Sequence, residues 1–181
     1  MYQAASYTRT AIGLHWLMVF ALLASFALGL YMQALPLSPD KLKFYSWHKW
    51  AGVTIFLLVL FRLLWRLTHH PPAPPADMPA WQRVAAEAAH WLLYVLMIAI
   101  PLSGWLMSSA KGFQTVYFGV LPLPDLLAKN KELGETLTSV HQALNFTLAG
   151  LVPIHAGAAL KHHFMDRDGV LARMLPFIKK A

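Results

Sequence analysis

The chain has 181 residues, of which 57% are hydrophobic and 13% are charged, and its formal net charge is +7 at pH 7. This balance excludes an ordinary soluble domain and is typical of a protein in a lipid bilayer; the basic residues flank apolar runs, so no nucleic-acid partner is expected. There is no cysteine, which excludes disulfides, cysteine-ligated zinc, iron–sulfur clusters and covalent haem attachment.

Four apolar segments are long enough to cross a bilayer, which takes about 20 residues of helix. We expect spans at about residues 10–33, 46–67, 86–108 and 137–161. The second has the shortest charge-free window, residues 50–61, but it continues apolar on both sides, and its Lys and Arg side chains can extend toward the interface. The sequence therefore predicts an all-α, integral membrane four-helix bundle, formed by a single domain over residues 1–181.

The first segment starts after Arg9 and looks at first sight like a signal peptide, but it is too long and lacks a convincing cleavage site, so we expect it to remain as a span. The link after the second span holds five prolines within residues 71–79 and is predicted to be extended. The connection at about 109–138 is polar enough to lie outside the membrane, and we expect a short surface helix at 125–135.

Four spans place both termini and the proline-rich link on one side of the membrane. That side collects nine basic residues: Arg9, Arg62, Arg66, Arg83, Lys161, Arg167, Arg173, Lys179 and Lys180. The other side collects six: Lys41, Lys43, Lys49, Lys111, Lys129 and Lys131. Because cytoplasmic loops carry an excess of Lys and Arg, we expect both termini to be cytoplasmic.

Histidines inside hydrocarbon are costly and need a partner or a function. His15 and His155 lie at matching depth, roughly 8 and 9 Å from the cytoplasmic ends of the first and fourth spans. His48 and His141 match each other near the opposite ends of the second and fourth spans. The others, apart from His90, are expected to be solvated or interfacial: His69, His70, His162 and His163.

His141 and His155 are fourteen residues apart, so they lie about 21 Å apart along a helix and point within about 40° of one another. The fourth span therefore offers one imidazole to each of two stacked sites, with His48 and His15 as the second imidazoles. Two facing imidazoles without another strong donor suit a haem iron, whereas zinc would need further ligands. The alternative is four separate core histidines, each bonded to neighbouring backbone.

His90, on the third span, competes for the inner iron. It lies nearer the interface than His15 and His155, so we expect it to support the ligands or to belong to a quinone site, with displacement of one ligand as the alternative. Gly29 and Gly52 offer places where a macrocycle can lie against a helix, although small residues also serve ordinary helix packing in membranes.

Six motifs resemble the bacterial cytochrome b561 family over nearly the whole chain. They are IGLHW at 12–16, WHKWAG at 47–52 followed by RLLWRL to 67, AHWLLY at 89–94, PLSGW at 101–105, VHQALN at 140–145, and HAGAALKHHF at 155–164 with LARMLP after it. The resemblance implies a four-helix protein of the bacterial inner membrane with two b-type haems. It implies that His15 and His155 hold the cytoplasmic-side haem iron and that His48 and His141 hold the periplasmic-side one.

The resemblance also implies a quinone partner, and the stand-alone family members look like superoxide oxidases that pass electrons to ubiquinone. We expect the cations Lys41, Lys43 and Lys49 to attract superoxide at the periplasmic face. The quinone would be bound near the inner rim by His162, Arg83, Trp81 and His90. The alternative is a cytochrome b subunit that relays electrons between a dehydrogenase or hydrogenase partner protein and the quinone pool.

Overall fold

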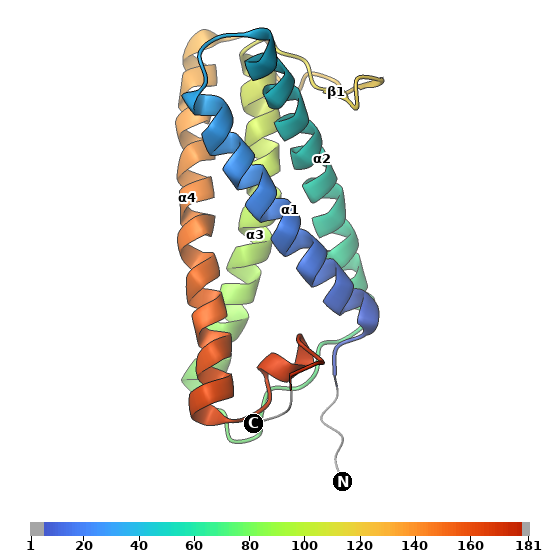
Figure 1. Cartoon of the computed structure of the whole chain (residues 1–181), viewed down its shortest axis with the longest axis vertical. Helices are drawn as coiled ribbons and strands as arrows, with labels where there is room; N and C mark the ends of the chain where they lie inside the picture. The colour runs from blue at the N-terminus through green and yellow to red at the C-terminus, as the bar shows by residue number, and fades with distance from the viewer. Residues whose placement is uncertain (1–5, 179–181) are drawn as a thin grey trace.

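Four long helices make up most of the protein, whose computed structural model describes residues 6–178. They are α1 (Arg9–Ala34), α2 (Pro39–Thr68), α3 (Ala80–Ala110) and α4 (Lys131–Lys161). They run along the long axis of the molecule, with α1 crossing the others obliquely (Figure 1). Each is long and apolar enough to cross a membrane. The expected all-α membrane four-helix bundle is confirmed.

Two helices, α2 and α4, begin earlier than the apolar segments alone indicate, because polar side chains cap them. Ser38 Oγ accepts a hydrogen bond from the Lys41 amide, and Pro39 fills the first turn, so α2 starts at residue 39 rather than about 46. Asn130 Oδ1 accepts from the Leu133 amide at the start of α4. The helices therefore continue beyond the spans of apolar residues at both of these starts.

The connection between α3 and α4 differs from expectation. The surface helix at 125–135 is wrong: residues 125–130 are not helical, and 131–135 are the start of α4. The connection instead holds a two-stranded antiparallel hairpin, β1 (Val116–Tyr117) and β2 (Leu121–Pro122). Pro122 and Pro124 disfavour helix up to residue 123, and the Asn130 cap starts the next helix only at residue 131.

The α3–α4 connection, including its hairpin, packs against α2 through polar contacts. Trp50 Nε1 donates to the Val116 carbonyl at 2.7 Å, and the Thr54 and Tyr117 hydroxyls lie 2.9 Å apart. Lys49 Nζ donates to the Phe113 carbonyl at 2.8 Å. The connection therefore covers one end of the bundle, which we call the outer end.

The first and last described residues lie together at the opposite, inner end of the bundle (Figure 1). After α4 the chain continues as a π-helix, η1 (His162–Asp166), and a short 3₁₀ turn, η2 (Leu171–Arg173). Trp16 Nε1 donates to the Met174 carbonyl at 2.9 Å, and Arg173 donates to the Ala73 carbonyl at 2.6 Å. These bonds hold the C-terminal segment and the proline-rich link across the inner end.

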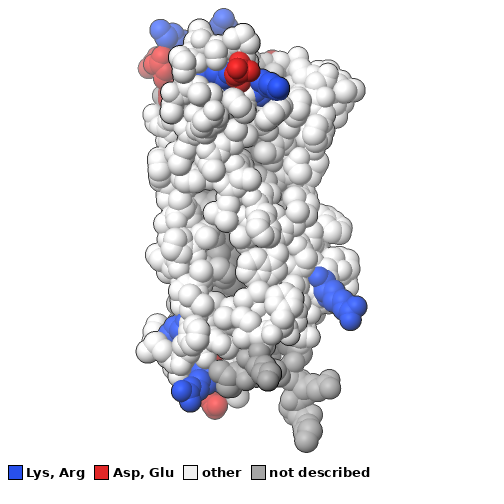
Figure 2. Space-filling view, in the orientation of Figure 1, with Lys and Arg blue, Asp and Glu red and all other residues white. Residues whose placement is uncertain are grey.

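Between the two ends the bundle is closed by apolar packing. Met18, Val59, Tyr94 and Met97 form one buried cluster, and Leu96, Ile100 and Leu148 form a second. Charged residues gather at the two ends of the face in Figure 2, with a broad band between them that is almost free of charge. That distribution fits a bundle whose middle faces lipid.

Candidate haem-binding sites

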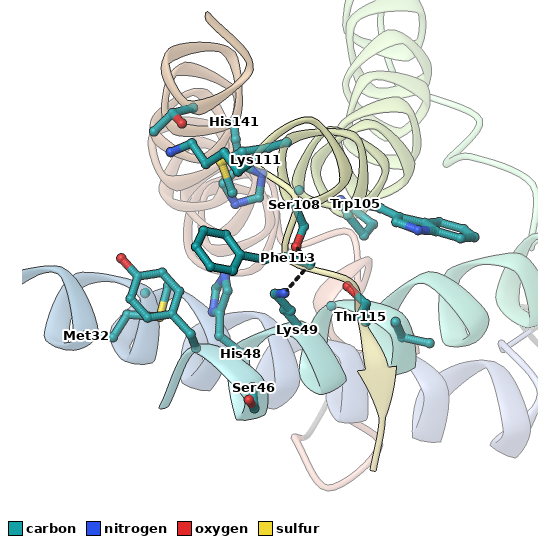
Figure 3. A pocket seen from close by; sticks show the side chains of 18 of the residues that line it. Met32, Ser46, His48, Lys49, Trp105, Ser108, Lys111, Phe113, Thr115 and His141 are labelled. Atoms are coloured by element: carbon teal, nitrogen blue, oxygen red, sulfur yellow. Dashed lines mark hydrogen bonds between the residues drawn. The ribbon is translucent and has the colours of Figure 1, made fainter. Parts of the chain in front are cut away.

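The outer pair of histidines lies across a cavity. His48 on α2 and His141 on α4 have ring centroids 6.3 Å apart, with the ring planes perpendicular. Both side chains border a cavity of about 740 Å³ at the outer end (Figure 3). Phe26, Phe56 and Phe146 contribute to its mainly apolar wall. A cavity of this size and lining suits a large apolar cofactor with a few fixed polar contacts.

The surroundings of His141 determine which ring nitrogen carries the proton. Ser103 Oγ donates its hydrogen to the Ile100 carbonyl at 2.7 Å, so toward His141 Nδ1, 2.9 Å away, it can only accept. The Ile100 carbonyl, 3.0 Å from the same nitrogen, is also an acceptor. Nδ1 must therefore carry the proton, which leaves the lone pair of Nε2 available for a metal, as in most metal-ligating histidines.

Two glycines allow the outer imidazoles to lie against a helix backbone. A Cβ at Gly104 would lie 3.1 Å from His141 Cε1, and one at Gly29 would lie 3.3 Å from His48 Cε1. A Cβ at Gly52 would meet nothing within 4 Å, although Gly52 lines the cavity. Gly29 and Gly104 therefore make room for the histidines themselves, whereas Gly52 leaves open space beside them.

The inner pair has nearly the same spacing. His15 on α1 and His155 on α4 have ring centroids 6.4 Å apart. His155 also has a second imidazole beside it, since the ring of His90 on α3 lies 5.3 Å away. Three histidines from three helices therefore meet at this level of the bundle.

These centroid distances can be compared with the distance expected between two imidazole rings that bind one metal. Metal–nitrogen bonds of about 2.0–2.1 Å place ring centroids on opposite sides of one metal about 6.4 Å apart. The outer pair at 6.3 Å and the inner pair at 6.4 Å both match this spacing. His90 and His155, at 5.3 Å, are too close for it, so His15 fits better as the partner of His155. The donor sets present therefore fit two bis-histidine haems.

The lysines expected to attract an anion have different surroundings. Lys41 and Lys49 line the outer cavity, as does Lys111. Lys41 Nζ donates to the Leu35 carbonyl, at the end of α1, and Lys49 Nζ donates to the Phe113 carbonyl. The ammonium of Lys43 lies 5.0 Å from the ring centre of Trp47. Lys49 directly follows His48 in the chain. Its hydrogen bond to Phe113 holds its ammonium group against the α3–α4 connection.

The residues expected to bind a quinone are spread over the inner end. Trp81 and Arg83 are exposed in the first turns of α3, and the Arg83 guanidinium lies 3.4 Å from the Met78 carbonyl. His162 begins η1, where its Nδ1 lies 2.5 Å from Asp168 Oδ2 and 3.2 Å from Asp166 Oδ2. His90 lies deeper, against His155. The structure therefore joins His90 to the inner histidine pair, whereas His162 belongs to a separate polar cluster.

Sequence reasoning missed several residues that support these histidines. Ser103 and Gly104 lie within PLSGW, where the motif alone does not show that they contact His141. Ser25, whose Oγ is 3.4 Å from His48 Nδ1, looks like a small residue in an apolar helix. Asp168 follows η1 after Arg167, whose φ of 53° turns the chain back toward His162. The depth of a histidine within its own apolar segment, which singled out these histidines, says nothing about which residues of other helices contact them.

The comparisons with known proteins point to one family. A family model described as prokaryotic cytochrome b561 matches residues 6–177. Cytochrome b561 homolog 2 of Escherichia coli K12 is 36% identical over 162 residues, covering 89% of this chain and 86% of that protein. Cytochrome b561 homolog 1 of the same organism is 30% identical over 173 residues, covering 94% and 97%. A probable superoxide oxidase CybB of Yersinia pestis is 29% identical over 175 residues, covering 94% and 96%.

Proposed function

Because this chain belongs to the prokaryotic cytochrome b561 family of membrane electron-transfer proteins, we propose that it moves electrons across the bacterial inner membrane through two b-type haems, from superoxide to ubiquinone. The observation that carries the proposal is the pair of histidine spacings, 6.3 Å at the outer end and 6.4 Å at the inner end. One helix, α4, supplies a histidine to each pair, about 21 Å apart along its axis. His48 and His141 would hold the outer iron, and His15 and His155 the inner one.

The protein's own residues fix the ligands and separate the two sites. A bis-histidine haem supplies one-electron transfer and leaves no coordination position open for oxygen. Ser103 and the Ile100 carbonyl hold His141 in the tautomer that ligation requires. The buried layer around Met18, Val59 and Met97 keeps water out of the region between the pairs.

We assign superoxide oxidation to the outer end. Lys41, Lys49 and Lys111 line the cavity that contains His48 and His141, and cations at the mouth of an apolar cavity attract a small anion. The similarity to a probable superoxide oxidase of Yersinia pestis supports this choice of donor. In the net reaction, two superoxide anions, one ubiquinone and two protons give two molecules of oxygen and one ubiquinol.

We assign quinone reduction to the inner end. Reduction of a quinone to a quinol consumes two protons, and His162 is an imidazole held by a carboxylate, Asp168, at 2.5 Å. That arrangement orients the ring and leaves Nε2 available to hydrogen-bond a carbonyl oxygen. Trp81 and Arg83 on α3 would stack against and bind the headgroup, and His90 would connect it to the inner pair.

We place the inner end in the cytoplasm. The basic residues of the link, the ends of α2 and α4 and the C-terminal segment support this orientation by the excess of Lys and Arg on that side. Lys179 and Lys180, which contribute to the count, lie outside the described residues. The outer cavity then lies on the periplasmic side.

Pulses of superoxide test the proposed donor. Oxidised, purified protein in detergent is mixed with superoxide, and haem reduction is followed by absorbance with and without a short-chain ubiquinone. We expect haem reduction that outruns spontaneous dismutation, followed by reoxidation when the quinone is present. Addition of superoxide dismutase before mixing is the control and should abolish the signal.

The same experiment separates the enzyme from a relay subunit. If superoxide reduces the haems no faster than it dismutates, while chemically reduced protein still reduces the quinone, electrons must come from a partner protein. That result would overturn the superoxide assignment and leave the electron path intact.

A further inference from the structure

Two arginines of α2 lie beside the inner histidines inside the bundle. The Arg62 guanidinium nitrogen Nη2 is 3.0 Å from His15 Nδ1, and Nη1 is 3.8 Å from Met18 Sδ. The guanidinium carbons of Arg62 and Arg66 lie 5.8 Å from the ring centre of Tyr94, and that of Arg66 also lies 5.8 Å from Trp91. The two charges therefore share one aromatic platform.

No carboxylate balances these charges. Within residues 6–178, every ion pair belongs to Lys161 or His162, and no Asp or Glu oxygen lies within 4.0 Å of Arg62 or Arg66. Both arginines are half-buried in a helix that crosses the membrane. Charged side chains at such positions are normally paired, so the site is short of about two negative charges.

A metal bound at His15 Nε2 would require Arg62 to give up its hydrogen bond to His15 Nδ1. A guanidinium only donates, so His15 Nδ1 must accept, and in a neutral imidazole the proton then sits on Nε2. A histidine that ligates iron through Nε2 carries its proton on Nδ1 instead, as His141 does at the outer end. When His15 holds a metal, the Arg62 guanidinium therefore needs another acceptor.

We propose that Arg62 and Arg66 bind the propionate carboxylates of the haem held by His15 and His155. This rests on the proposed function only in assuming a haem at that pair. A b-type haem carries two carboxylates, which matches the two unbalanced guanidinium groups in number and in charge. Arginine suits this role because its planar fork binds carboxylate bidentately.

The pairing sets the reduction potential of the inner haem. Positive charge near a haem disfavours the oxidised, more positive iron and so raises the potential. Removing one charge should lower the equilibrium constant for reduction about tenfold, or about 59 mV for a one-electron couple. One charge has this effect over about 12 Å at an effective dielectric constant of about 20.

The test is a spectroelectrochemical titration of the purified holoprotein, which requires neither superoxide nor quinone. Arg66→Gln is the informative variant, because it removes a positive charge from a side chain that is not hydrogen-bonded to His15. Arg62→Lys keeps the charge, and Arg62→Gln removes it. Arg9→Gln is the matched control, since Arg9 is an exposed arginine at the same end of the bundle. The His15→Ala variant identifies which potential belongs to the inner haem.

We expect Arg66→Gln and Arg62→Gln to lower the inner potential by about 59 mV each, or to release the inner haem, while the outer potential stays unchanged. Arg62→Lys should restore most of the difference. Inner potentials that match those of Arg9→Gln would overturn the proposal. A normal titration in a protein that superoxide does not reduce would leave this inference standing and refute only the donor.

The carboxylates must also be distinguished from lipid phosphate, which could occupy the same arginines. The titrations are therefore repeated in lipid-depleted detergent and in vesicles that contain phosphatidylglycerol. Equal shifts in both support haem propionates. A shift that appears only in the vesicles would assign the arginines to a phospholipid and contradict the proposal.

Discussion

At the scale of single residues, the outer site is built around an imidazole that has little freedom to move. His141 is held at Nδ1 by Ser103 and the Ile100 carbonyl, and its Cε1 edge faces Gly104. The ring therefore cannot move away from a side chain added at residue 104 without straining these contacts. The precision of the ligand comes from three neighbours on α3, which all lie within five residues of one another.

Gly104→Ala should weaken the outer haem site. The new Cβ would lie 3.1 Å from His141 Cε1, so the ring must shift by a few tenths of an ångström and strain its contacts with Ser103 and the Ile100 carbonyl. Disturbing the groups that orient a metal ligand typically lowers affinity about 10- to 100-fold. We expect a smaller haem-to-protein ratio, measured as the pyridine haemochrome. Gly150→Ala, where a Cβ meets nothing within 4 Å, is the control, and equal losses in both variants would contradict the steric account.

Asp168→Asn should impair the inner reaction without affecting either haem. An Asn amide offers a neutral oxygen acceptor or an N–H donor, so it no longer fixes the ring and tautomer of His162 as the carboxylate does at 2.5 Å. We expect quinone reduction by pre-reduced protein to slow roughly 100-fold, the lower end of the range for a positioned proton donor, and its pH profile to change. Stopped-flow haem reoxidation provides the measurement.

Asp166→Asn is the matched variant for that experiment. Asp166 lies farther from His162, at 3.2 Å, and also pairs with Lys161 at 2.7 Å. Its rate should stay within a few-fold of the parent. Comparable slowing in both variants would mean that net charge, and not the orientation of His162, controls the inner reaction.

The spatial pairing of the histidines could be predicted from the sequence, whereas the residues that contact them could not. Depth within an apolar segment is a one-dimensional property, and it paired His48 with His141 and His15 with His155. Contacts such as Ser103 with His141 join residues 38 positions apart on different helices. No periodicity in one helix specifies them, so they require the packed structure.

At the scale of elements, α4 joins the two sites and an apolar layer separates them. Leu148 lies midway between His141 and His155 and packs with Leu96 and Ile100 of α3. Met18, Val59 and Met97 belong to the neighbouring buried cluster, contributed by α1, α2 and α3. The apolar segments predicted these helices, but their true starts depend on caps at Ser38 and Asn130, and the hairpin of the α3–α4 connection has no strong pattern of its own.

Met18→Ala should destabilise the bundle through this layer. Met18 is 1% exposed, so its loss leaves a cavity that the neighbouring helices cannot close, at a cost of about 2–5 kcal/mol. Leu17→Ala is the control, because Leu17 is the preceding residue of the same helix and its side chain is 51% exposed. Thermal denaturation in detergent, followed by the haem absorbance, should show a clear fall in Tm for Met18→Ala and little for Leu17→Ala. Equal falls would contradict the proposed layer.

At the scale of the whole molecule, we propose that charge at the ends sets the orientation in the membrane. The described termini share the inner end, in line with an even number of spans (Figure 1). We expect a fluorescent protein fused after residue 181 to fluoresce, because it folds in the cytoplasm, and alkaline phosphatase fused at the same place to be inactive. The opposite pattern would reverse the sites proposed for superoxide and quinone.

The central claim is that four histidines hold two haems, one at each end of the bundle. Haem content and redox titration of the purified parent and of His15→Ala, His48→Ala, His141→Ala and His155→Ala test it most directly. We expect two haems per chain in the parent. The His48 and His141 variants should both lose the outer haem, and the His15 and His155 variants should both lose the inner haem. A parent with a single haem, or losses paired in any other way, would contradict it.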